Sequence, residues 1–335
     1  GGEFPARHHL QKENEMPKIP LALQPVDLVE IFSLVDNYSD VLLPGSETVI
    51  RPALAKDGVI PKSTLLAEHG LSLLVKVHAN GVAHSVILDA GYTNVAAPHN
   101  MKHLGLSPAR VEAIVMSHGH MDHTGALKEI IQGIGPGARV IVHPDVFLPR
   151  FLNLPNGMEV FFPPFPPKEE MQSWGAEVVE NKEPLLLCND TILVTGQIPR
   201  KTAFEKGFPG ACVRLDGKAA PDSFQDDQSL VISLGDRGLV VISGCAHAGI
   251  INSVLYAQAL TAQKKICAVV GGFHLTGPAM ESSIDPTVTE MKRLAPEVIV
   301  PMHCTGLNAI WKFSQEMPES FQLNSVGSKI HLLRE

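Results

Sequence analysis

Short apolar runs that end in small or polar residues recur along the whole chain. Two of them flank Asn80-Gly81, a pair that favours a two-residue hairpin turn because both positions tolerate a positive φ. The apolar runs predict strands at 26–36, 71–77, 82–88, 113–116, 139–143, 176–179, 191–194, 229–234, 239–243, 267–270 and 298–300. The stretches between them predict helices at 96–104, 126–131, 250–260 and 287–294. Strands that alternate with helices, with a hairpin at the start of each half, favour an α/β sandwich.

Three segments lack such a pattern. Residues 44–61 are rich in Gly and Pro, and we expect a loop or lid there. Residues 154–167 contain five prolines, which exclude a central strand or helix because proline lacks an N–H donor and has a fixed φ. We expect a surface insertion near the cleft, which either fills space or touches the substrate. Residues 196–227 are expected to be irregular.

The chain is predicted to hold one domain, residues 16–335, with insertions near 44–61 and 154–167. Residues 1–15 are polar, contain no initiator Met and do not resemble a signal peptide, so we interpret them as a disordered tail or a cloning remnant ahead of a natural start near Met16. His8 and His9 belong to this tail and are not taken as ligands.

Composition excludes several classes of partner. The 27 basic and 35 acidic residues give a net charge of −8, and without a basic run this argues against a nucleic-acid partner. No apolar stretch is long enough to span a membrane, which argues against a membrane partner. The five cysteines are scattered and lack CxxC spacing, so we interpret them as thiols of a reducing cytoplasm. The pattern predicts a cytoplasmic protein with a small-molecule substrate and makes no prediction of oligomeric state.

Four strong metal-ligand residues lie within six positions after the apolar run at 113–116. His118 and His120 alternate along an extended segment, so both can point the same way. Asp122 and His123 follow at the start of the next turn, displaced enough to serve a second ion. Imidazole and carboxylate ligands suit zinc, iron or manganese. This stretch predicts a metal site where a strand meets a helix.

A histidine with a glycine two or three residues away follows three further apolar strands, at His247, His274 and His303. Side chains at strand ends converge on one edge of a sheet. We therefore expect these histidines to lie near the metal motif.

The His-x-His-x-Asp-His motif after a buried strand resembles the signature of the metallo-β-lactamase superfamily. The resemblance implies a four-layer αβ/βα sandwich that carries one or two divalent ions, with zinc preferred over iron or manganese. It implies that one ion binds His118, His120 and His247, and that the other binds Asp122, His123 and His303. It also implies that Asp89 orients a ligand histidine, while His274 is expected to shape the site or contact substrate without holding the metal.

The chain departs from the usual superfamily pattern at two ligand positions. The strand at 239–243 ends in Gly244-Cys245 instead of Gly-Asp, and Gln197 occupies the place of a usual histidine. These features resemble the subgroup of 7,8-dihydropterin-6-methyl-4-(ribofuranosyl)aminobenzene 5′-phosphate synthase-like proteins. Other positions typical of the subgroup are Asp36, Asn37, Arg200, Thr202 and Glu205. Cys245 could act as a nucleophile, ligate a metal as a thiolate, or stay protonated and pack under the site; we favour the last.

The first functional hypothesis is a metal-dependent hydrolase of a small phosphorylated or ester-like substrate, since an ion lowers the pKa of bound water from 15.7 toward about 7. Asp122, His274 and Cys245 are its candidate catalytic residues. Arg200, which could contact an anionic group, and Asn37 and Thr202 are candidate substrate-binding residues. The alternatives are a transferase that joins a pterin to an arylamine ribose phosphate, a degenerate metal-binding protein without activity, and, as a minor option, redox use of iron.

Overall fold

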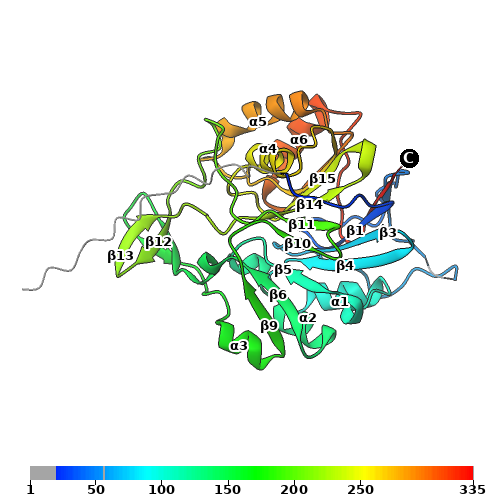
Figure 1. Cartoon of the computed structure of the whole chain (residues 1–335), viewed down its shortest axis with the longest axis horizontal. Coiled ribbons are helices and arrows are strands. Elements are labelled where there is room, and N and C mark those ends of the chain that lie inside the picture. Colours follow the sequence, from blue (N-terminus) through cyan, green and yellow to red (C-terminus); the bar gives the residue numbers. More distant parts are fainter. Residues whose placement is uncertain (1–19, 56, 335) are drawn as a thin grey trace, which may run out of the picture.

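The computed structural model describes residues 20–55 and 57–334 of the chain. Two sheets pack face to face, and helices cover the outer face of each sheet (Figure 1). This is the four-layer αβ/βα sandwich that the resemblance implied. The tail predicted at residues 1–15 lies outside the described residues.

The two large sheets contain most of the strands. The first has the order β2 (Val49–Ile50), β18 (Lys329–Leu333), β1 (Leu28–Val35), β3 (Ser72–Ala79), β4 (Val82–Leu88), β5 (Ala113–Val115), β6 (Ala138–Val142) and β9 (Ala176–Glu180). The second has the order β10 (Leu185–Leu187), β11 (Ile192–Val194), β14 (Ser229–Ser233), β15 (Leu239–Ser243), β16 (Ile266–Gly272) and β17 (Val298–Met302).

The helices divide between the two outer layers (Figure 1). The layer beside the first sheet contains α1 (Ala96–His103), α2 (Leu127–Ile134) and α3 (Lys168–Ser173). The layer beside the second sheet contains α4 (Ile250–Thr261), α5 (Glu281–Leu294) and α6 (Leu307–Glu316). Short 3₁₀ turns lie at Pro108–Arg110, Met121–His123, Pro144–Phe147, Gly235–Arg237 and His303–Thr305.

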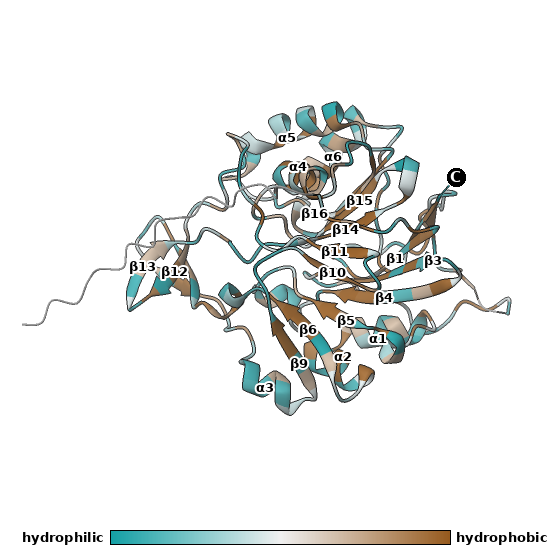
Figure 2. Cartoon of the chain, in the orientation of Figure 1, coloured by the Kyte–Doolittle hydropathy of each residue, from teal (hydrophilic) through white to brown (hydrophobic). Residues whose placement is uncertain are grey.

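Alternation along each strand divides its apolar side chains between two cores. In β3, Leu73 and Val75 face the second sheet, while Leu74 faces the helices of its own side. In β15, Val240 likewise faces the first sheet, and Val241 packs under α4 and α5. Because both faces are covered, the central strands are mostly apolar, as the colouring in Figure 2 shows, although β4 also contains polar residues.

The parallel strands bring several carboxyl ends to one edge of the sandwich. In the first sheet β4 and β5 run parallel, and in the second β15, β16 and β17 do. The hairpin predicted at Asn80-Gly81 joins β3 and β4, with φ of 52° and 78° at the two turn positions.

A third sheet corrects one prediction. Residues 196–227 are not irregular throughout, because β12 (Ala211–Leu215) and β13 (Lys218–Pro221) form a hairpin within them. Together with β7 (Arg150–Asn153) and β8 (Glu159–Phe161) they make a sheet of order β13-β12-β7-β8 that projects from the sandwich (Figure 1). The hairpin escaped prediction because its strands are short and only partly buried. As the prolines require, β8 is an edge strand.

Other differences lie toward the C-terminus. The helix predicted at 287–294 begins earlier, so α5 contains Pro286. Pro286 lies beyond the first turn and cannot donate one backbone hydrogen bond of the helix, while Ile284 packs this part of the helix into the core. Helix α6 and strand β18 were not predicted at all. Strand β18 pairs with β1 and depends on that long-range partner.

None of the helices within the described ranges is both long and apolar enough to cross a membrane. All five cysteines are free thiols. The division into one domain with insertions near 44–61 and 154–167 stays a prediction.

Candidate metal centre

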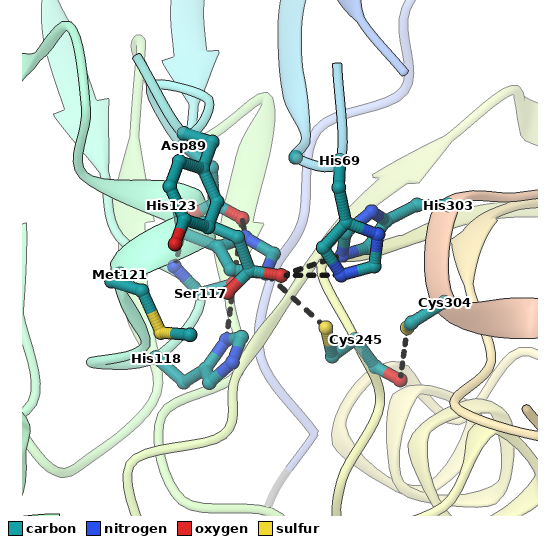
Figure 3. Close-up of polar contacts among 12 residues, drawn as sticks. His69, Asp89, Ser117, His118, Met121, His123, Cys245, His303 and Cys304 are labelled. Atoms are coloured by element: carbon teal, nitrogen blue, oxygen red, sulfur yellow. Dashed lines mark hydrogen bonds and ion pairs between the residues drawn. The ribbon is translucent and has the colours of Figure 1, made fainter. Parts of the chain in front are cut away.

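Histidines from both sheets meet at the edge where the parallel strands end (Figure 3). His118 and His120 follow β5 of the first sheet. His247 and His303 follow β15 and β17 of the second. The structure therefore brings together the residues that the sequence pattern selected, in two neighbouring groups of ligand atoms.

The first group consists of His118, His120 and His247, whose ligand atoms lie within 4.8 Å of one another. All three side chains are buried, and Nε2 of each has no hydrogen-bond partner. Burial lowers the pKa of each imidazole well below 6.5. Neutral imidazoles with free nitrogens pointing at one another are the donors that a zinc ion takes.

Ser117 determines which nitrogen of His118 is free. Its hydroxyl donates to Oδ2 of Asp89 at 2.6 Å, so its oxygen accepts the hydrogen bond from Nδ1 of His118 at 2.9 Å. The Nε2 atom of His118 then carries the lone pair, and this is the atom without a partner in the protein.

The second group consists of Asp122, His123, Cys245 and His303. Oδ2 of Asp122 lies 3.3 Å from Nε2 of His303 and 3.8 Å from Nε2 of His123. Burial by itself would raise the pKa of Asp122, but His123 and His303 outweigh it and lower that pKa. Burial by itself would lower the pKa of His123, yet the Asp89 and Asp122 carboxylates raise it to about 9. The second group therefore contains an ionised carboxylate, which suits a divalent cation, and a His123 proton that a bound cation would have to displace.

Asp89 orients candidate ligand residues through two hydrogen bonds. Its Oδ2 accepts from Nδ1 of His123 at 2.6 Å, and its Oδ1 accepts from the backbone N–H of Ser117 at 2.7 Å. The bond to Nδ1 leaves Nε2 of His123 directed into the second group. This is the orienting role that the resemblance implied for Asp89.

Cys245 lies between the first and the second group of ligand atoms. Its Sγ lies 3.2 Å from Nε2 of His123, and the residue also belongs to a third set of close ligand atoms with His247 and His274. Ala246 adopts a left-handed φ of 55°, so the chain leaves the extended conformation after the cysteine. Burial raises the pKa of the Cys245 thiol well above its ordinary value. The thiol is therefore protonated unless a cation displaces its proton.

His274 lies next to the first group, in contact with His247. Neither of its ring nitrogens has a hydrogen-bond partner, and its ring centroid is 4.2 Å from that of His247. It lines a small cavity of about 20 Å³, which is enough for a single water molecule. Its exclusion from the ligands stays a prediction.

A comparison with protein families shows which family the chain belongs to. The family model described as metallo-beta-lactamase superfamily matches residues 67–303, a range that contains both ligand groups. The chain belongs to the metallo-beta-lactamase superfamily. The resemblance stated on the His-x-His-x-Asp-His motif is thereby confirmed.

Two relatives come from Methanocaldococcus jannaschii. One is 7,8-dihydropterin-6-methyl-4-(beta-D-ribofuranosyl)-aminobenzene-5′-phosphate synthase, which is 31% identical over 280 residues, 83% of this chain and 94% of that protein. The other, an uncharacterized protein, is 32% identical over 256 residues, 74% of this chain and 88% of that protein. The similarity to the synthase agrees with the subgroup that the motifs indicated.

Solved structures of the superfamily share the fold. Tm1679, described as a metal-dependent hydrolase of the beta-lactamase superfamily, matches with a TM-score of 0.67 and 24% identity over 91% of this chain and 99% of that one. The metallo-beta-lactamase fold protein YhfI from Bacillus subtilis matches with a TM-score of 0.50 and 12% identity over 91% and 100%. At these identities the likeness concerns the fold alone.

A buried ion pair between Arg150 and Asp226 holds the backbone between His118 and His120 in place. Oδ2 of Asp226 accepts from the N–H of Gly119 at 2.9 Å, and its Oδ1 accepts from Arg150 at 2.7 Å. A Cβ at Gly119 would lie 2.7 Å from the carbonyl oxygen of Val146, so only glycine fits there. The ion pair was missed because it joins β7 to a segment predicted to be irregular.

The three candidate substrate-binding residues have contacts within the protein. Arg200 donates to the carbonyl oxygens of Ser223 and His247, at 2.6 and 2.9 Å. Thr202 donates to Glu205, which in turn accepts from two backbone N–H groups at the start of α4. These contacts position the chain beside His247. Substrate contact by Arg200 and Thr202 stays a prediction.

Asn37 contacts a ligand directly. Its Oδ1 accepts from Nδ1 of His303 at 3.1 Å, which leaves Nε2 of His303 directed at Asp122. Oδ1 of the neighbouring Asp36 accepts from the backbone N–H of His303 at 2.9 Å. Asn37 therefore orients a candidate ligand histidine, and its contact with the substrate stays a prediction.

His69 is the site residue that the sequence pattern missed. Its Nε2 lies 3.6 Å from Oδ2 of Asp122, and its ring lies 5.2 Å from that of His303 (Figure 3). It precedes β3, whereas the other histidines follow their strands. The available signal was the Glu68-His69-Gly70 sequence, another His-Gly pair beside an apolar run.

A further set of possible ligand atoms, His84, Glu112 and Cys188, lies away from this centre near the other end of β4. Its histidine nitrogens already pair with Glu112 at 2.6 Å and with Asn189 at 3.3 Å. We therefore interpret it as a hydrogen-bonded network.

Proposed function

We propose that this protein is a metal-dependent hydrolase of a small phosphorylated or ester-like substrate. The observation that carries the proposal is the pair of adjacent buried ligand groups, in which Nε2 of His118, His120, His247 and His303 has no partner. Burying four such nitrogens without a partner is costly in free energy. Bound cations would satisfy these atoms.

The donor types fit zinc and also suit iron or manganese. The first group offers three neutral imidazoles, and the second offers a carboxylate, two imidazoles and the Cys245 sulfur. When bound, the ions would acidify a water molecule and polarise a phosphoryl or carbonyl oxygen. A zinc-loaded protein with up to two ions per chain is the form that this proposal requires.

Asp122 is the centre of the proposed chemistry. Its carboxylate lies within 3.8 Å of nitrogens of His69, His123 and His303, and it is largely buried. Its lowered pKa keeps it ionised, so it can bind a cation and accept a hydrogen bond that orients the attacking water. The histidines on either side restrict the directions from which a water can approach.

The substrate would lie in a cavity of about 550 Å³ beside the second group. Its polar edge includes Asn37, His69 and His303, and its walls include Leu307 and Ile310. A mostly apolar cavity with polar groups on one side suits a small molecule that carries one anionic or ester group.

The synthase reaction is the second candidate, and one observation favours it. The chain aligns with 94% of the length of the M. jannaschii synthase at 31% identity, so nearly all of that protein has a counterpart in this chain. In that reading the ions would polarise a leaving diphosphate while the pterin and the arylamine ribose phosphate meet in the same cavity.

A panel assay on the zinc-loaded protein tests both candidates. Phosphomonoesters, phosphodiesters, carboxylic esters and lactones form one arm, and a pterin diphosphate with an arylamine ribose phosphate forms the other. The proposed function predicts turnover in the first arm that is lost in Asp122→Asn and after chelation. Diphosphate release only when both co-substrates are present would favour the synthase. A protein with fewer than two ions and no turnover in either arm would be a degenerate member.

A further inference from the structure

His69 is exposed at the mouth of the metal centre, whereas the ligand histidines are buried. Its side chain is 62% exposed, and it borders the cavity of about 550 Å³ that also contacts His303. The residue belongs to none of the sets of close ligand atoms. A histidine at this place can reach a bound molecule without being a metal ligand.

The amide of Asn37 determines the tautomer of His69. Its Oδ1 accepts from the N–H of Gly70 at 3.3 Å, and its Nδ2 donates to the carbonyl oxygen of His303 at 3.3 Å. These two backbone partners determine which end of the amide is oxygen and which is nitrogen. The NH₂ end then faces Nδ1 of His69 at 3.2 Å, so Nδ1 is the acceptor and the hydrogen is on Nε2.

The same amide thus gives two histidines opposite roles. His303 donates from Nδ1 to Asn37 and keeps a lone pair on Nε2, as a ligand must. His69 accepts at Nδ1 and presents an N–H at Nε2 toward the second group. That N–H is 3.6 Å from Oδ2 of Asp122, which is too far for a hydrogen bond, and it remains available to a third atom.

We infer that His69 binds the substrate by donating a hydrogen bond from Nε2 to an anionic oxygen held beside Asp122. The substrate class is a phosphate ester or a related anion, with its remaining part in the cavity next to Leu307 and Ile310. This inference rests on the proposed function. It assigns His69 to binding and not to metal ligation or proton transfer.

Calorimetry of inorganic phosphate binding to the zinc-loaded protein tests the proposed hydrogen bond from His69. A hydrogen bond to a charged group corresponds to roughly a 10- to 100-fold change in affinity, so His69→Ala should raise the phosphate Kd by about that factor with zinc content unchanged. His69→Gln keeps an N–H donor and should retain most of the affinity. His99→Ala, whose ring packs on His103 in α1, serves as the matched control and should bind phosphate as the wild type does.

The outcomes separate the two proposals. If the wild type binds phosphate and His69→Ala binds it equally well, the role of His69 is overturned while the proposed function stands. Zinc loss in His69→Ala would show that the residue is a ligand and would also overturn the inference. If the zinc-loaded wild type does not bind phosphate, the phosphoryl-substrate proposal fails, and the inference fails with it.

Discussion

Nδ1 of His123 lies 2.6 Å from Oδ2 of Asp89, and neither side chain is exposed to solvent. Because Asp89 also holds Ser117, which in turn holds His118, one carboxylate orients a histidine in each ligand group. The two candidate ion sites would thus be coupled through a residue that belongs to neither ligand group.

Asp89→Asn should therefore weaken binding at both sites, by about 10- to 100-fold. Asparagine tolerates the left-handed φ of 61° at this position, so the backbone should survive the change. Zinc titration against a competing chelator measures the effect. Asp216→Asn, at another left-handed position in an exposed turn, is the matched control. Unchanged zinc affinity in Asp89→Asn would contradict the orienting role.

The two ligand groups should lose their ions separately. His118→Ala or His120→Ala should remove most of the first ion and abolish activity while the fold survives. His303→Ala should instead loosen the second ion, because its neighbours are Asp122 and His123. Elemental analysis of the purified variants distinguishes the groups. Equal loss of both ions in every variant would indicate a single shared site.

His274→Ala should keep near-native zinc content and lose turnover. The side chain faces a cavity of about 20 Å³ next to His247, where it can hold a water or contact the substrate. Zinc content and kcat, measured on one preparation, check this. A variant stripped of zinc would show that His274 is a ligand in addition to His247.

Substitutions at Cys245 test how two neighbouring ions would influence one another. A protonated thiol contributes no charge between the cations, so Cys245→Ser should leave the tighter ion bound, and Cys245→Asp should strengthen the weaker one by supplying a bridging carboxylate. Metal titration of both variants measures this. Loss of both ions in Cys245→Ser would mean that the thiolate is a bridging ligand.

The two sites should differ in their dependence on pH. Burial lowers the pKa of His118, His120 and His247 well below 6.5, so protons should not compete with the first ion between pH 7 and pH 9. The pKa of His123 is about 9, so a cation in the second group must displace a proton below that pH. Affinity for the second ion should accordingly rise by about tenfold per pH unit up to pH 9.

Chelator competition at pH 7, 8 and 9 checks this difference. The same competition experiment with Cys245→Ser separates the proton of His123 from the proton of the thiol, since a bound cation could displace either one between pH 7 and pH 9. Identical pH profiles for the two ions would contradict the assignment of His123 to only one site.

Local sequence was sufficient for the strands that build the site. Buried strands of a layered fold are nearly continuous apolar runs, so β3, β4, β5, β15, β16 and β17 could be predicted within a few residues. The candidate ligand histidines were predictable for the same reason, because each lies in the loop or turn that follows one of these strands.

Contacts between distant segments could not be predicted. The strand β18 and the ion pair of Arg150 with Asp226 depend on partners far away in the chain, and their own residues are polar or only partly apolar.

From sequence, the His-x-His-x-Asp-His motif indicated the superfamily and the layered fold that this resemblance implies, and the apolar strands placed the other candidate histidines at strand ends. The grouping of the candidates, the position of Cys245 between them and the exposure of His69 to the cavity depend on how distant segments pack together. His69 and His303 expose Nε2 in different forms, because one side chain, Asn37, donates to Nδ1 of the first and accepts from Nδ1 of the second. Such a difference arises from hydrogen-bond geometry across 266 positions of sequence and leaves no trace in local composition.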